Sequence, residues 1–297
     1  MFEEVRGNFP ELARYIENSY GQASVLNYGE GSLHNSTGVH QGDPLGPFLF
    51  SLTLQPVLKK IQDVEGIVQN SWYLDNGEVV GGKQALVEIW DLLTREGEPR
   101  GLYLSREKSV VFCPSHDPAD QDPIDRGVTR TTEGGFKLLG APIGEEDFVE
   151  EVLRRRLEGV RSLLAELHIL EDPHLEFTLL RSCFSFPKFA FALRTVDTSG
   201  HQNILQDFDM AVKESIEEVL GAPLRPHQWD QASLPVSLGG LGLRRAANHG
   251  AAAYIASVGD SELLVQDIRG HHQGVDGERA LASLNLQLGE VLSMEEA

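Results

Sequence analysis

Residues 38–50 have the sequence GVHQGDPLGPFLF, in which a loop rich in Gly and Pro runs directly into an apolar segment. Gly42 allows the backbone to approach a ligand closely, and Pro44 fixes the course of the turn. Apolar residues then recur at helical spacing from Pro47 to Ile61, which predicts a buried helix that opens at a proline. The pattern indicates a ligand-binding loop on a buried helix, and a plain turn before a helix is the alternative.

Three further segments follow this loop in order. Ile67–Leu74 alternates as a strand does, and Asp75–Gly77 has the composition of a tight hairpin turn. Residues 102–112 contain a strand that we expect to carry Lys108. The segment FKLLG, Phe136–Gly140, predicts a short strand that ends at a glycine.

After Gly144 the pattern changes from short strands to amphipathic helices. We therefore predict an α+β protein in three parts. Residues 1–144 mix strands and helices, residues 145–258 are helical, and residues 259–297 form an acidic C-terminal tail that is partly helical or disordered.

The excess of acidic residues and the lack of long apolar runs limit the kinds of partner that the chain can bind. The chain has 297 residues with 45 acidic and 25 basic side chains, a formal charge of −20. Such a surface on average repels nucleic acid, so binding would need a local basic groove. No secretory signal and no apolar run of membrane-spanning length is visible, so we expect a soluble, intracellular protein without a membrane partner.

Taken in order, these segments resemble the reverse transcriptase (RNA-directed DNA polymerase) domain of non-LTR, LINE-type retrotransposons. Residues 38–50 match the family's loop-to-helix motif almost residue for residue, and Tyr73-Leu74-Asp75-Asn76 falls where the family has Tyr-x-Asp-Asp. Residues 101–109 resemble the next motif, 136–140 the primer grip, and LGGLGL at 238–243 a segment beyond the thumb. The resemblance covers roughly residues 1–250.

This resemblance implies a partial right-hand polymerase fold. We expect a palm-like domain over residues 1–144, an antiparallel sheet with packed helices, followed by an all-helical, thumb-like region over 145–258. The fingers would be missing. The chain as given begins at Met1, so we also expect the family's first catalytic Asp, which lies upstream of the segment resembling Phe2–Tyr20, to be absent.

The resemblance also implies a role for individual residues. The implied nucleotide- and template-binding residues are Gln41, Gly42, Pro44 and Tyr73, the catalytic positions are Asp75, Asn76 and Lys108, and the primer grip is Leu139 and Gly140. Polymerisation uses two divalent metal ions held by carboxylates, so Asp75 is the candidate ligand for Mg²⁺ or Mn²⁺. Asn76 offers only a neutral carbonyl where the family has a carboxylate.

We therefore expect a degenerate reverse-transcriptase-like chain without catalytic activity of its own. Its cofactor would be Mg²⁺ or Mn²⁺ if the chain is active, and no cofactor is the alternative. An RNA template and a DNA primer are implied by the resemblance but disfavoured by the charge of −20. One alternative is a non-catalytic palm–thumb module that binds a protein partner. The other is an active polymerase assembled with a second chain that carries the missing Asp.

Overall fold

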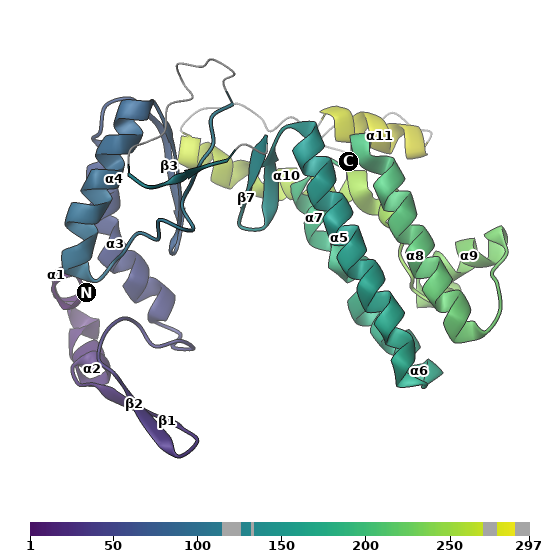
Figure 1. Ribbon diagram of the computed structural model, residues 1–297, viewed down its shortest axis with the longest axis horizontal. Coiled ribbons are helices and arrows are strands. Elements are labelled where there is room, and N and C mark those ends of the chain that lie inside the picture. Colours follow the sequence, from purple (N-terminus) through teal and green to yellow (C-terminus); the bar gives the residue numbers. More distant parts are fainter. Residues whose placement is uncertain (115–125, 132–133, 270–277, 289–297) are drawn as a thin grey trace. The chain divides into compact units, whose positions relative to one another are not determined.

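The computed structural model describes residues 1–114, 126–131, 134–269 and 278–288. The chain divides between Thr131 and Thr132 into two compact units, which are described separately below. The class is α+β with a predominance of helix, as the sequence predicts (Figure 1).

The first unit alternates helices with short strands. Its elements are α1 (Phe2–Asn8), α2 (Pro10–Tyr20), β1 (Ser24–Tyr28), β2 (Gly31–Asn35), α3 (Gly46–Gln62), β3 (Ile67–Tyr73), β4 (Asn76–Gly81), α4 (Lys83–Gly97), β5 (Val110–Val111) and β6 (Thr129–Arg130). The β1–β2 and β3–β4 pairs are antiparallel hairpins, and β5 pairs with β6 in parallel. In the described part of the chain each pair forms its own two-stranded ladder, so the single palm-like sheet expected from the sequence is not formed.

Helix α3 is the centre of this unit because its two halves enter different apolar clusters. Leu49 and Leu52, near its start, are buried with Val5 of α1 and Ile16 of α2. The second half packs against α4 and against the inner face of the β3–β4 hairpin. The loop before α3 and the β3–β4 hairpin are thus positioned by one continuous helix (Figure 1).

The second unit begins with a hairpin and continues as a helical bundle. Its elements are β7 (Gly135–Leu138), β8 (Ala141–Gly144), α5 (Glu146–Leu167), α6 (Pro173–Leu179), the π-helical turn η4 (Leu180–Phe184), α7 (Phe186–Thr195), α8 (Gln202–Leu220), α9 (Pro226–Ser233), α10 (Ala246–Arg269) and α11 (Glu278–Leu288). Helix α10 continues well past residue 258, so the first residues assigned to a tail lie inside a helix.

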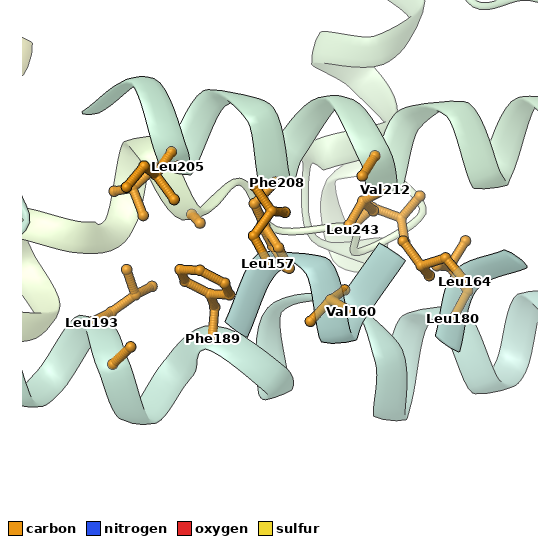
Figure 2. Close-up of a cluster of buried hydrophobic side chains, with 14 of the residues drawn as sticks. Leu157, Val160, Leu164, Leu180, Phe189, Leu193, Leu205, Phe208, Val212 and Leu243 are labelled. Carbon is orange, nitrogen blue, oxygen red and sulfur yellow. The ribbon is translucent and has the colours of Figure 1, made fainter. Parts of the chain in front are cut away.

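The bundle is held by one large apolar cluster that α5, α7 and α8 build together. Figure 2 shows Phe189 of α7 pointing toward Phe208 of α8, and their ring centroids are 4.6 Å apart. Leu157 of α5 lies beside them, and Leu243, just before α10, is also fully buried in the cluster. The amphipathic periodicity predicted after Gly144 is the source of this core.

Candidate functional site

The loop before α3 is fixed by a network around Asp43. One carboxylate oxygen of Asp43 accepts a hydrogen bond from the Leu45 amide at 2.9 Å, and the other accepts one from the Tyr20 phenol. The Tyr20 ring stacks on His40 with centroids 4.5 Å apart, and the Tyr20 oxygen accepts a bond from the His40 amide at 3.3 Å. Ser24 on β1 in turn lies 3.1 Å from the His40 ring nitrogen Nε2. The loop is therefore tied to both α2 and β1.

This network also sets the charge state of the loop. The Tyr20 phenol, followed by the Leu45 amide, lowers the pKa of the Asp43 carboxyl below its ordinary value. Burial, followed by the bond to Asp43, raises the pKa of the Tyr20 phenol. Asp43 is thus an ionised structural residue that the sequence reasoning missed. An Asp placed directly before a Pro at the start of a helix is the local signal that could have found it.

The residues predicted to face a nucleotide lie around this fixed centre. Gly42 has a φ of +89°, a conformation in which a side chain is strained, and its missing Cβ points into open space. Gln41 is exposed and has no hydrogen-bond partner in the described part of the chain, and Pro44 is exposed beside it. The loop therefore presents an accessible backbone and a free amide side chain. Their predicted roles are not tested by this geometry.

The β3–β4 hairpin places its turn one residue earlier than the sequence predicted. Tyr73 pairs directly with Asn76, so Leu74 and Asp75 form the two-residue connection and Asn76 is the first residue of β4. Leu74 takes a φ of +55°, which is an outlier for a side chain of this size. The expected Asp75–Gly77 turn is therefore wrong.

The Trp72 side chain explains why Gly77 lies within β4 and not in the turn. The two residues are direct partners across the hairpin, and a Cβ on Gly77 would lie 2.4 Å from atoms of the indole ring. The Trp72 Nε1 donates to Asn70 Oδ1 at 2.6 Å, which fixes the orientation of the ring over Gly77. The ring needs the space that only glycine leaves, so the positive φ falls on Leu74.

We expect Gly77→Ala to destabilise the first unit by about 1–3 kcal/mol, because the new methyl group forces the Trp72 ring out of its place. Thermal unfolding followed by tryptophan fluorescence measures this. Gly82→Ala is the matched control, since Gly82 has a negative φ and open space around its Cβ position. Equal melting temperatures for the two variants would contradict the packing role of Gly77.

The hairpin turn presents one carboxylate, that of Asp75, at an exposed position. Asn76 Nδ2 lies 3.3 Å from Asp75 Oδ1 and donates to it, so an amide stands where a second carboxylate would be needed. The described residues contain no group of three or more His, Cys, Asp or Glu side chains with the geometry of a metal site. They do not by themselves fit a two-metal centre, and a metal ion at Asp75 would need ligands from elsewhere.

Of the other predicted residues, Tyr73 lies next to this pair, because it is the cross-strand partner of Asn76, and it is 65 % exposed on the outer face of the hairpin. Lys108 lies in an exposed turn before β5, because the strand expected to carry it is only Val110–Val111. In the described part of the chain no hydrogen bond or ion pair links the Gln41–Leu45 loop to the hairpin.

Leu139 and Gly140, the predicted primer grip, form the two-residue turn of the β7–β8 hairpin in the second unit. Their φ values are +49° and +89°, and Leu139 is 53 % exposed. The hairpin therefore repeats a feature of β3–β4, a leucine with positive φ at the first turn position. Unusual backbone of this kind concentrates at functional sites, although it does not define a function.

Comparison with known proteins gives one informative result. No family model matches the chain. The retrotransposable element SLACS 132 kDa protein of Trypanosoma brucei gambiense is 28 % identical over 215 residues, which is 72 % of this chain. The match spans only 18 % of the length of that relative. The similarity supports a retrotransposon-related origin for this chain.

Among the residues that the structure describes, we find no helix whose length and hydropathy would let it span a bilayer.

Proposed function

We propose that this chain is a reverse-transcriptase-like segment of retrotransposon origin that has no polymerase activity of its own. The observation that carries the proposal is the Gln41–Leu45 loop at the start of α3, followed by the β3–β4 hairpin with Asp75 at its turn. The similarity to a retrotransposable element protein over 215 residues supports the same ancestry. In this proposal the first unit corresponds to a palm and the helical bundle to a thumb.

The composition of the hairpin turn supports the loss of activity. Two-metal nucleotidyl transfer needs negatively charged oxygen ligands to hold both ions between the primer hydroxyl and the triphosphate. Asn76 offers a carbonyl and directs its amide group at Asp75, which occupies one of the carboxylate's acceptor positions. A metal ion here would lose the charge of a second carboxylate and would have to displace this contact.

We expect Asn76→Asp to strengthen Mn²⁺ binding at the hairpin by about tenfold or more, because it restores a second carboxylate next to Asp75. Titration with Mn²⁺ followed by electron paramagnetic resonance measures this on the full chain. Asn76→Ala is the matched control, because it removes the same amide without adding charge. The double variant Asp75→Ala/Asn76→Asp should lose the gain. If Asn76→Asp binds Mn²⁺ no better than Asn76→Ala, the hairpin is not a former metal site.

Activity is tested separately with a primed RNA template, deoxynucleoside triphosphates and Mg²⁺ or Mn²⁺. The unmodified chain should give no extension above a protein-free reaction. Extension by the unmodified chain that disappears in Asp75→Ala would overturn the proposed loss of activity.

A second candidate function is a non-catalytic palm–thumb module that binds a protein partner. The net charge of −20 favours it, because an acidic surface on average repels a polyanion. The two candidate functions can be distinguished by nucleic-acid binding, which a reverse-transcriptase-like segment would retain and a protein-binding module would not need.

A further inference from the structure

Two stretches of the second unit carry cations without any carboxylate. No Asp or Glu occurs between Glu176 and Asp197, or between Asp230 and Asp260, in a chain that has 45 acidic residues. The first stretch contains η4 and α7, and the second contains the end of α9 and the first half of α10. An acidic protein can still attract a polyanion where its cations are concentrated and its carboxylates are absent.

Two cations of this region lie over aromatic rings, and two others are paired with carboxylates at the ends of the second stretch, Arg194 with Asp260 and Arg245 with Asp230. Lys188 Nζ is 5.7 Å from the centroid of the Phe184 ring, and the Arg244 guanidinium carbon is 5.7 Å from that of Phe186. In the described residues neither cation has an ion pair with a carboxylate. Stacking on a ring leaves the outer side of each cation open to an anion.

The arginines of helix α5 provide the contrast. Arg154, Arg155 and Arg161 each bond a glutamate one turn away on the same helix. Their charge is therefore largely compensated, as is usual on a solvated helix face. Lys188 and Arg244 differ from these arginines because they stack on rings and have no ion pair among the described residues. They differ also from Arg245, which stacks on Trp229 but is paired with Asp230.

The residues of this region lie on neighbouring segments. Lys188 lies over the ring of Phe184, the last residue of η4, and Phe191 follows Lys188 by three residues on the same face of α7. The Arg181 side chain lies directly over Gly242, with its Nε 3.1 Å from where a Cβ would be.

The surface then continues onto α10. Gly242 is two residues before Arg244, which covers the ring of Phe186. The Phe186 ring also meets the His249 ring edge-to-face at 5.4 Å. The cation–aromatic surface is defined here as Arg181, Phe184, Phe186, Lys188, Phe191 and Arg244.

The far end of this surface reaches the turn of the β7–β8 hairpin. A Cβ on Gly140 would lie 3.7 Å from the Phe191 ring, and the Arg156 guanidinium carbon lies 5.6 Å from the centroid of the same ring. Phe191 itself is 44 % exposed. An accessible ring therefore lies between the turn and the cations of α7.

We propose that the cation–aromatic surface binds single-stranded nucleic acid. Lys188, Arg181 and Arg244 would contact phosphates, and bases would stack on Phe191 and on the stacked guanidinium of Arg244. The alternation of rings with cations favours this ligand over an acidic peptide, which would need the cations alone. The choice of nucleic acid also rests on the proposed retrotransposon origin, but it does not require polymerase activity.

The test uses fluorescence anisotropy of a labelled oligonucleotide of about 20 nucleotides with the full chain at about 50 mM salt, where electrostatic binding is strong. The triple variant Arg181→Gln/Lys188→Gln/Arg244→Gln should bind about tenfold or more weakly. Its logarithmic salt dependence should fall by about 2, since each phosphate contact on a single strand contributes about 0.7. The matched control Arg154→Gln/Arg155→Gln/Arg161→Gln changes the net charge equally but removes only paired arginines.

Stacking is tested by Phe191→Leu, which keeps an apolar side chain and should weaken binding about fivefold or more through loss of base stacking. Equal weakening by the two triple variants, no effect of Phe191→Leu, or no binding by the unmodified chain would each overturn the proposal. These results are independent of the Mn²⁺ titration, because all the residues changed here belong to the second unit. If Asn76→Asp fails to strengthen Mn²⁺ binding, the hairpin is not a former metal site, and nucleic-acid binding by the cation–aromatic surface is still tested by the oligonucleotide titrations.

Discussion

Phe208→Ala should lower the free energy of unfolding of the helical unit by about 3–5 kcal/mol. Phe208 is fully buried on α8 and packs on Phe189 at the centre of the cluster in Figure 2. Removing the ring leaves a cavity lined by side chains of α5, α7 and α8, and these side chains cannot all move inward to fill it. Because such a loss is a large fraction of the stability of an ordinary domain, the second unit should melt well below its melting temperature in the unmodified chain.

The control for this variant is Met210→Ala, two residues further along the same helix, where the side chain is 52 % exposed. Hydrogen exchange read by mass spectrometry reports each unit separately, so the effect can be assigned. Phe208→Ala should raise exchange throughout α5, α7 and α8, while Met210→Ala should leave it nearly unchanged. Similar exchange in both variants would mean that the cluster does not control the stability of the unit.

The elements predicted most accurately from the sequence are those whose pattern is local. The helix after the Gly42–Pro44 loop, now α3, appears where the apolar periodicity indicated it, because a buried helix needs little more than its apolar stripe. The segment Phe136–Gly140 also contains a strand, but β7 ends at Leu138, and Leu139 and Gly140 form the turn. The positive φ of Leu139 is not predicted by any preference of leucine.

The errors arise where contacts between side chains or strands, and not the preferences of single residues, decide the outcome. Asn76 and Gly77 have ideal turn chemistry, but the Trp72 ring needs the space at Gly77, and this moves the turn to Leu74 and Asp75. A cross-strand contact of this kind has no signature in single-residue preferences. The expected palm sheet failed for a similar reason, because strand pairing between hairpins depends on tertiary packing that hydrophobic alternation does not encode.

The candidate site shows the same difference. Short motifs suffice to propose Gln41, Gly42 and Asp75, whose roles stay predictions, whereas the bond from Tyr20 to Asp43 joins residues 23 positions apart and has no such motif. The cation–aromatic surface was also missed, since Lys188 and Arg244 come from separate segments and look like ordinary surface cations in the sequence. The net charge of −20 gives no indication of where on the surface these cations lie.

Asp209, the neighbour of Phe208, should make the stability of the helical unit depend on pH. Its side chain is 7 % exposed and accepts hydrogen bonds from the amides of Ala246 at 2.6 Å and Ala247 at 3.1 Å. These amides are the first two of α10, so a carboxylate on α8 caps a helix that lies 37 residues further along the chain. Asp209→Ala leaves both amides unpaired and should cost about 2–4 kcal/mol.

The direction of the pH effect follows from the raised pKa of the Asp209 carboxyl group. Burial raises the pKa of Asp209 from 3.8 to about 6, against the opposing pull of the two amides and Arg245. The folded state therefore binds the proton of the Asp209 carboxyl more tightly than the unfolded state does. The stability that this proton adds to the folded state is complete below pH 3.8 and is lost as the pH rises through 6. A difference of this size corresponds to about 3 kcal/mol between the two limits.

Asp209→Asn separates this contribution from the other acidic groups of the chain. The amide oxygen can still accept one of the two helix amides, but it carries no proton to lose between pH 4 and 7. Urea unfolding at several pH values should show that the stability of the unmodified chain falls relative to that of Asp209→Asn as the pH rises through 6. A constant difference between the two proteins across this range would show that Asp209 does not change its protonation on folding. The cap would then act as a permanently charged contact between α8 and α10.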